Sequence, residues 1–119
     1  MKRDWDVIRR VLLKTEALPT EDSTLSSDEI NGIDAECAAY HMRLLLEAGL
    51  IAGGCRDAVG TAYCHASRLT WEGHEFLDRI KRDNVWNKVK ETARVKGVDL
   101  SFGVIRMAAE AVIKGLMGG

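Results

Sequence analysis

The chain has 119 residues, of which 46% are hydrophobic and 29% are charged, and its formal net charge is −1. This size and composition predict one soluble globular domain, and the small net charge argues against a strongly basic nucleic-acid binder. No apolar run is long enough to cross a membrane, and "MKRDWDVIRR" lacks the apolar stretch of a signal peptide, so we expect a cytoplasmic protein.

The charges are unevenly distributed along the chain. Residues 1–66 carry 7 basic and 11 acidic side chains, whereas residues 67–119 carry 10 basic and 7 acidic ones. Most of the basic excess lies between Arg79 and Lys96. This segment is either where phosphate groups would be attracted or simply the polar side of two amphipathic helices.

The first predicted helix begins after Asp4, a good N-cap, and ends before Pro19. Its apolar residues recur at helical spacing: Trp5, Ile8, Val11 and Leu12. The polar segment 20–33 is expected to be a loop followed by a short strand, with a short helix over 27–31 as the alternative.

A second helix is predicted over 35–48, with Asp34 as its N-cap and Gly49 in the left-handed position after its end. Its inward arc is Ala38, His41, Met42, Leu45 and Ala48. We expect His41 to be a core histidine with a hydrogen-bonded ring.

A β-hairpin is predicted next. Leu50 and Ile51 begin the first strand, and "TAYCHASRL" alternates as the return strand. The intervening "GGCRDAVGT" is longer than a tight two-residue turn and is expected to be a mobile loop.

Three helices are predicted to follow. Thr70 caps a helix over 71–82, Asp83 caps one that ends at Gly97, and Ser101 caps the last. The last helix has an apolar stripe made of Ile105, Ala108, Ala109, Val112, Ile113 and Leu116. We expect the tryptophans Trp5, Trp71 and Trp86 to be largely buried.

The element order predicts a mainly α (α+β) protein. A helical unit followed by a two-stranded hairpin is typical of a winged helix, a variant of the helix-turn-helix. We therefore expect a winged-helix-like core over residues 1–82, with a β-hairpin wing, and a C-terminal helical extension over 83–119 within the same domain.

Four blocks of sequence carry a family resemblance: "MKRDWDVIRRVLL", "YHMRLLLEAGLI", "RLTWEGHEFLDRI" and "WNKVKE". The second and third resemble winged-helix proteins among bacterial transcription regulators. Together the four resemble a family of small prophage-associated proteins known as a domain of unknown function, over nearly the whole chain except 18–33 and the wing loop. The resemblance implies a phage or prophage setting and supplies no reaction or cofactor.

The sequence contains no group of residues with the spacing expected of a catalytic site. Cys37, Cys55 and Cys64 are too few and too irregular for a disulfide framework and are expected to be free thiols. The spacing of Cys55, Cys64 and His65 matches no usual zinc site. His74 and Asp78 share a helix face, which suits helix stabilisation better than acid–base catalysis. We expect no enzyme activity, metal or cofactor.

Two binding functions remain. The first is DNA binding by a transcriptional regulator, with the exposed side of helix 35–48 in the major groove. The second is a protein-binding module that inhibits a host defence complex in the manner of an anti-CRISPR protein, with the acidic helix as a nucleic-acid mimic. The contact candidates for either function are Glu36, Tyr40, Arg43, Glu47, Arg56, Lys88 and Lys96.

The apolar stripe of the last helix needs a covering surface, because a patch of this size is unfavourable in water. It packs either on the domain's own core or, as we favour, on a second copy of the chain. The residues expected in such a homodimer contact are Ile105, Val112 and Leu116.

Overall fold

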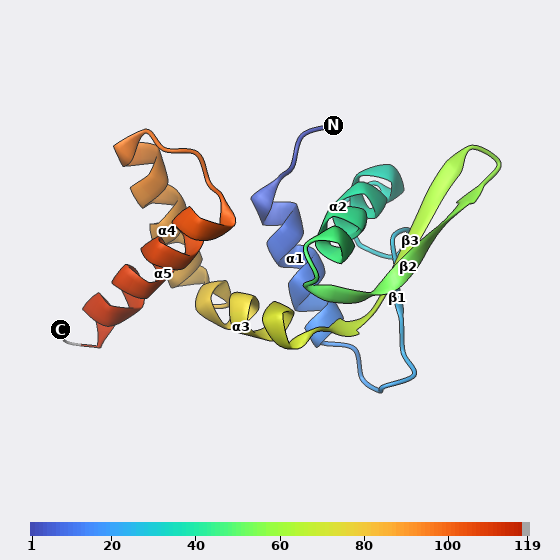
Figure 1. The fold of residues 1–119 in the computed structure, drawn as a ribbon, viewed down its shortest axis with the longest axis horizontal. Coiled ribbons are helices and arrows are strands. Elements are labelled where there is room, and N and C mark those ends of the chain that lie inside the picture. The colour runs from blue at the N-terminus through green and yellow to red at the C-terminus, as the bar shows by residue number, and fades with distance from the viewer. Residues whose placement is uncertain (118–119) are drawn as a thin grey trace. The chain divides into compact units, whose positions relative to one another are not determined.

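The computed structural model describes residues 1–117, and within them the chain forms an α+β fold with five helices and three strands (Figure 1). The chain divides into two compact units, Met1–Glu75 and Phe76–Gly119. Helix α3 (Trp71–Ile80) begins in the first unit and ends in the second.

The two long helices of the first unit begin at the predicted caps. The carboxylate of Asp4 accepts the backbone N–H of Asp6 at 2.9 Å at the start of α1 (Trp5–Glu16). Asp34 accepts the N–H of Cys37, also at 2.9 Å, at the start of α2 (Ala35–Glu47). Gly49 follows α2 with φ of 73°, the left-handed conformation predicted for it.

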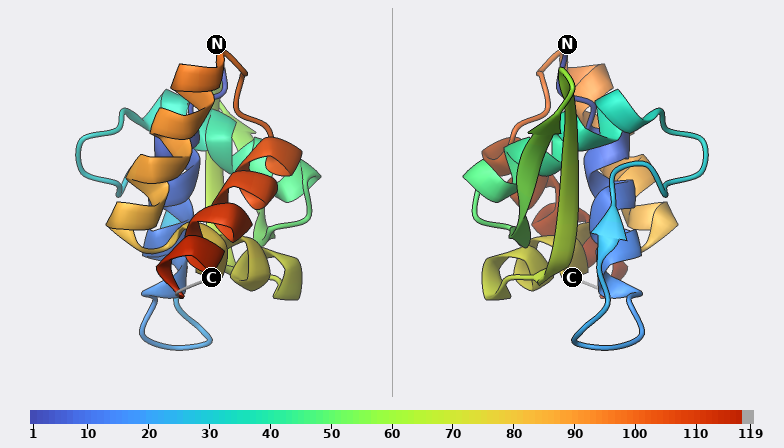
Figure 2. Two further views of the ribbon diagram at one scale, coloured as in Figure 1. Left: turned by 90° about the vertical axis from the view of Figure 1, so that its left-hand side faces the viewer. Right: turned by 90° about the vertical axis from the view of Figure 1, so that its right-hand side faces the viewer.

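An antiparallel sheet completes the first unit. Its strands are β1 (Leu25–Ser26), β2 (Ile51–Ala58) and β3 (Thr61–Leu69), in the order β1-β3-β2 (Figure 2). The predicted hairpin and the short strand within 20–33 are confirmed. The predicted short strand is β1, and it pairs with β3, so the sheet has one strand more than the two-stranded hairpin. A strand of two residues is too short for its partner to be read from alternation.

The connection between β2 and β3 is shorter than expected. Ala58 pairs with Thr61, so Val59 and Gly60 alone form the turn, with φ of 52° and 78°. The prediction of a longer loop is wrong because Gly53 lies inside β2, where a β-carbon would overlap the carbonyl oxygen of His65. Glycine at this position lets the two strands approach each other closely and does not form a turn.

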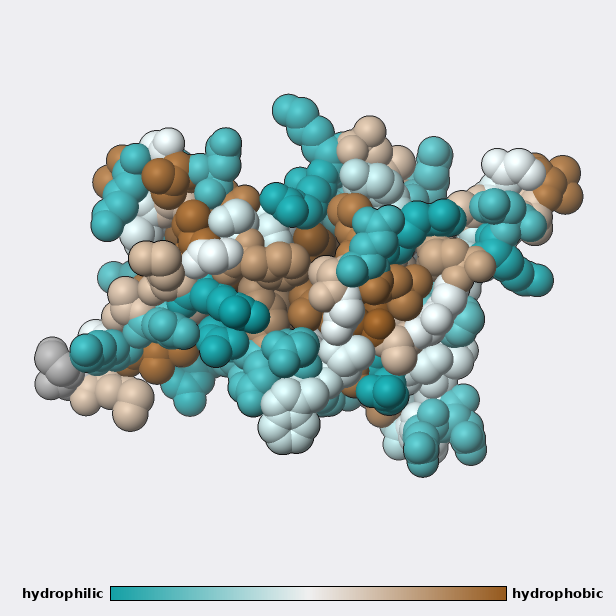
Figure 3. All heavy atoms as spheres, viewed as in Figure 1, coloured by the Kyte–Doolittle hydropathy of each residue, from teal (hydrophilic) through white to brown (hydrophobic). Residues whose placement is uncertain are grey.

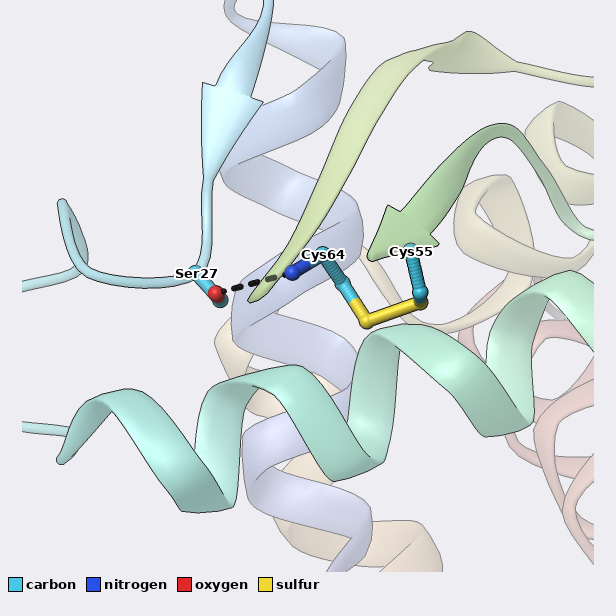
Figure 4. Close-up of a disulfide and its surroundings, with 3 residues drawn as sticks. All are labelled: Ser27, Cys55 and Cys64. Atoms are coloured by element: carbon cyan, nitrogen blue, oxygen red, sulfur yellow. Dashed lines mark hydrogen bonds between the residues drawn. A yellow bond between two sulfur atoms is a disulfide. The ribbon is translucent and has the colours of Figure 1, made fainter. Parts of the chain in front are cut away.

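A disulfide crosses this hairpin and corrects the expectation of three free thiols. Cys55 and Cys64 are directly opposite in the register of β2 and β3, and they are bonded to each other (Figure 4). Cys37 remains a free thiol. The irregular spacing in sequence gave no sign of this pairing because the strand register alone brings the two side chains together.

Helices α1 and α2 pack on each other and against the sheet, and the core lies between them. Among its fully buried members are Val11, Leu12, Ala38, Met42 and Ala66. Ala39 is buried as well, although the inward arc predicted for this helix did not include it. Because α2 is covered both by α1 and by the sheet, its buried arc is wider than a single stripe.

The start of α3 is tied to the end of α2 through Thr70. The Thr70 hydroxyl donates to the carbonyl of Gly49 at 2.6 Å and accepts the N–H of Gly73 at 3.0 Å. Thr70 is therefore the predicted cap. The prediction for Trp71 is wrong, because this side chain is 78% exposed. The buried side of α3 begins at Gly73, and Trp71 lies on the opposite side of the helix. Trp5 and Trp86 are buried, as predicted.

The second unit contains α4 (Asp83–Lys96) and α5 (Phe102–Leu116), which run in opposite directions and pack on each other (Figure 2). Ser101 caps α5 and Gly97 ends α4 with φ of 67°, both as predicted. Asp83 is not the N-cap of α4. Arg82 takes that position without a side-chain cap bond, and Asp83 lies in the first turn.

Candidate interaction surfaces

The exposed side of α2 brings four of the predicted contact residues together. Glu36, Arg43 and Glu47 are exposed, and Tyr40 is partly exposed. Their spacing places them on one side of the helix, and we call this set the α2 face. The ring of Tyr40 meets that of His41 edge-on, with centroids 5.3 Å apart, so its orientation is held by the core.

A second surface lies on the hairpin. The guanidinium of Arg56 lies 5.9 Å from the ring centroid of Tyr63, on the side of the hairpin away from the buried Cys64. His65 alternates onto the same side as Tyr63. We call Arg56, Tyr63 and His65 the hairpin face. It offers one permanent cation on an aromatic ring.

The hairpin is held near its middle by two kinds of cross-link. Beside the disulfide, Cys64 donates its backbone N–H to the hydroxyl of Ser27 at 3.1 Å, and Ser27 donates its own N–H to the Cys64 carbonyl at 2.8 Å (Figure 4). The outer half of the hairpin extends beyond these bonds, where β2 and β3 pair with each other. The tip is apolar in Figure 3, and Val59 there is fully exposed.

The two units differ strongly in charge. Residues 1–75 carry 8 basic and 13 acidic side chains, a net charge of −5, and residues 76–119 carry 9 basic and 5 acidic ones, a net charge of +4. The α2 face itself has one arginine against two glutamates. The acidic unit therefore contains the helix and hairpin, whereas the basic excess predicted near 79–96 belongs to the other unit.

Lys88 and Lys96 do not belong to the α2 face. Both are exposed on α4, where they line an open groove of about 690 Å³ between α4 and α5. The rest of that lining is mostly apolar and includes Met107, Ala108, Ala111 and Leu116. This groove was not predicted from the sequence. The signal for it was in α5, whose apolar residues extend around most of the helix.

The buried His41 is a structural residue, as predicted. Its Nδ1 donates to the carbonyl of Cys37 at 2.8 Å, because Nε2 accepts the backbone N–H of Asp4, also at 2.8 Å. The ring thus joins the start of α1 to α2. Both nitrogens are occupied by backbone groups, so His41 has no nitrogen to offer a substrate.

Cys37 lies beside this histidine, with its sulfur 3.6 Å from Nδ1. Burial raises the pKa of the Cys37 thiol, and the negative charges of Asp34 and Asp4 raise it further. At neutral pH the sulfur is therefore a protonated thiol, which is a poor nucleophile.

Residues 1–117 contain neither a metal-binding cluster nor a membrane-spanning helix. No group of three or more His, Cys, Asp or Glu side chains there is arranged to hold a metal ion. None of the helices in that range has the length and hydropathy needed to cross a bilayer.

These features define a small α+β protein whose hairpin rests on a pair of helices and whose C-terminal part is helical. The chain belongs to the family of hypothetical proteins designated DUF2513, which matches residues 2–99. It is 40% identical over 117 residues to an "Uncharacterized protein" of Haemophilus influenzae, covering 98% of this chain and 99% of that protein. No solved structure matches the chain. The predicted membership of a domain-of-unknown-function family is confirmed.

Proposed function

We propose that this protein is a non-enzymatic, winged-helix-like DNA-binding protein that acts as a transcriptional regulator in a phage or prophage setting. The strand order β1-β3-β2, with α2 directly before the hairpin, is the observation that carries the proposal. In winged-helix proteins, a helix in this position enters the major groove and the hairpin forms the wing. The turns between β1 and α2 stand where such proteins have a further helix.

In the first unit, the contacts would come from the α2 face and the hairpin face. Tyr40 and Arg43 on α2 would meet the groove, and Arg56 on the disulfide-bonded hairpin would meet a phosphate. In the second unit, Lys88 and Lys96 are separate candidates for phosphate contact. Glu36 and Glu47 repel phosphate, so the affinity would be modest and would depend strongly on salt.

Retention of a mixed-sequence DNA duplex, measured by fluorescence anisotropy at 50 and 200 mM salt, tests this proposal. We expect salt-sensitive binding at micromolar protein that weakens when Arg43 and Arg56 are both replaced by glutamine. Each lost phosphate contact should lower the slope of log K against log salt by about 0.9. No DNA retention at low salt would refute the proposal.

A second function is favoured by the acidity of the same unit. With a net charge of −5 over residues 1–75 and two glutamates on the α2 face, this surface suits a basic protein groove. In this alternative the protein is an interaction module that inhibits a host defence complex, and α2 imitates the phosphates of a nucleic acid.

One charge variant distinguishes the two functions, because they predict opposite effects on binding. Replacing Glu36 and Glu47 by glutamine removes two negative charges from the α2 face without shortening the side chains. If α2 enters DNA, this variant should bind DNA more tightly than the natural protein, because two repulsions are removed. If α2 imitates nucleic acid, the natural protein should capture a partner from host lysate and the variant should not. In that case neither of them should bind DNA.

A further inference from the structure

Helix α5 has more apolar surface than its own unit covers. Ile105 and Ala109 are fully buried, but Met107 is 73% exposed and Leu116 is 56% exposed. Between residues 104 and 116, the charged residues form a single row at intervals of four: Arg106, Glu110 and Lys114. A helix with so narrow a polar row normally has most of its circumference buried.

The uncovered part of α5 forms one wall of the groove described above, and α4 forms the other. Apolar and polar residues are interspersed over the α4 and α5 region in the view of Figure 3. Met107, Ala108, Ala111, Val112, Gly115 and Leu116 line the α5 wall. Ile105 is not among them, so this wall uses only Val112 and Leu116 of the three residues predicted for a homodimer contact.

We propose that this groove receives α5 of a second copy of the chain, antiparallel to the first α5. A two-fold axis between Ala111 and Val112 makes the α5 wall complementary to itself. Six wall residues then face one another across the two copies: Met107 faces Leu116, Ala108 faces Gly115, and Ala111 faces Val112. The proposal does not depend on DNA binding.

The sizes of these side chains suit close packing. Ala108, Ala111 and Gly115 are small and let two helix backbones approach each other, and no heavy atom lies within 4 Å of a β-carbon added at Gly115. Met107 and Leu116, which are both exposed and large, pair at both ends of the contact. Such a two-fold contact uses the same surface twice, as closed dimers do.

The charges at the groove also favour this arrangement. Lys96 ends α4 and lines the groove together with Val104 near the start of α5. The antiparallel register brings the last turn of the second α5 to that end. The unsatisfied carbonyls of a helix C-terminus carry partial negative charge, so Lys96 meets a complementary group there.

A contact of two α5 helices alone is small. A helix of 15 residues is about 22 Å long, and a standard interface buries about 800 Å² on each partner. Because α4 lines the groove as well, the second α5 rests on both helices and the two copies form a bundle of four helices. We therefore expect a dimer with a dissociation constant in the micromolar range.

Light scattering after size exclusion, over a 100-fold range of concentration, tests the dimer. We expect twice the mass of one chain at high concentration, and a monomer when the exposed Ala111 is replaced by glutamate. The control variant is Arg106→Glu, which introduces the same residue in the polar row of the same helix and should remain dimeric. A natural chain that stays monomeric, or an Ala111→Glu variant that stays dimeric, would overturn the proposal.

Cross-linking tests the register separately. In a Cys37→Ser background, Met107→Cys and Leu116→Cys chains are mixed and treated with a short bismaleimide. The mixture should give cross-linked pairs at least tenfold more readily than either variant alone, because positions 107 of two antiparallel copies are about 13 Å apart. Equal cross-linking of Met107→Cys with itself would overturn the antiparallel register. Failure of mixed pairs in a chain that is dimeric by mass would overturn the groove as the contact.

Discussion

Gly73, in the first turn of α3, lies against the carbonyl of Leu50, where a β-carbon would overlap the oxygen. Thr70 donates its N–H to that same carbonyl at 3.0 Å. The end of the α2 segment and the start of α3, separated by the whole hairpin in sequence, are therefore joined at one backbone group. This contact explains why "EAGL" before the hairpin is matched by "LTWEG" after it.

Replacing Gly73 by alanine should destabilise the first unit. Alanine is the better helix former by about 1 kcal/mol, but the overlap with Leu50 must be relieved by moving the helix or the strand. We expect a net loss of about 1–3 kcal/mol in the free energy of unfolding, measured by urea denaturation. Gly103→Ala is the matched control, because only Ser101 comes as near as 4.0 Å to its added β-carbon. That variant should be neutral or more stable.

Removing the disulfide should weaken the hairpin. Cys55 and Cys64 close a loop of about ten residues, and the chain-entropy relation assigns such a link about 2–3 kcal/mol. We expect a lower melting temperature in reductant for the natural protein and no such change for a Cys55→Ala, Cys64→Ala double variant.

Counting reactive thiols checks the same bond chemically. Denatured protein should take up one alkylating group without reductant and three after reduction, as the bonded and free cysteines require. Uptake of three groups without reductant would show that the bond is absent.

The turn between β2 and β3 should be improved by Val59→Asn. A β-branched residue is unfavourable at a φ of 52°, whereas Asn followed by Gly is the preferred pair for a two-residue hairpin turn. We expect a gain of about 1 kcal/mol in unfolding free energy. Val95→Asn, at an exposed position of α4, should change the stability by less than about 0.5 kcal/mol. Equal effects of the two substitutions would contradict the strained turn.

Cys37 should be alkylated slowly at neutral pH. Burial and the nearby charges of Asp34 and Asp4 raise its pKa in the folded chain, so the thiolate fraction is smaller than in an unfolded chain. The folded state therefore holds this proton more tightly. The stability that the protonated Cys37 thiol contributes is complete at pH values below the pKa of the unfolded chain. This contribution is lost as the pH rises through the pKa of the folded chain.

Alkylation rates of the folded protein, followed by mass spectrometry from pH 7 to 10, check this. The rate should rise at higher pH than that of a short peptide containing Cys37. A rate profile that coincides with the peptide's would show that the folded chain does not perturb the thiol.

The sequence by itself determined the elements whose signals are local. Asp4, Asp34 and Ser101 cap their helices because each needs only the N–H groups of the following turn. The short strand near Leu25 and the paired strands after Gly49 were likewise predictable from pattern and turn residues. The contact residues on α2 also shared one side of the helix, as its period requires.

Only the tertiary structure decided which distant residues meet. The register of β2 and β3 placed Cys55 against Cys64, and the docking of α3 on Leu50 turned Trp71 outward. The same is true of Ala39, which is buried because α1 and the sheet both cover α2. Periodicity along one helix or strand gives which residues share a side. It does not give how many sides are covered, because that depends on packing between segments far apart in sequence.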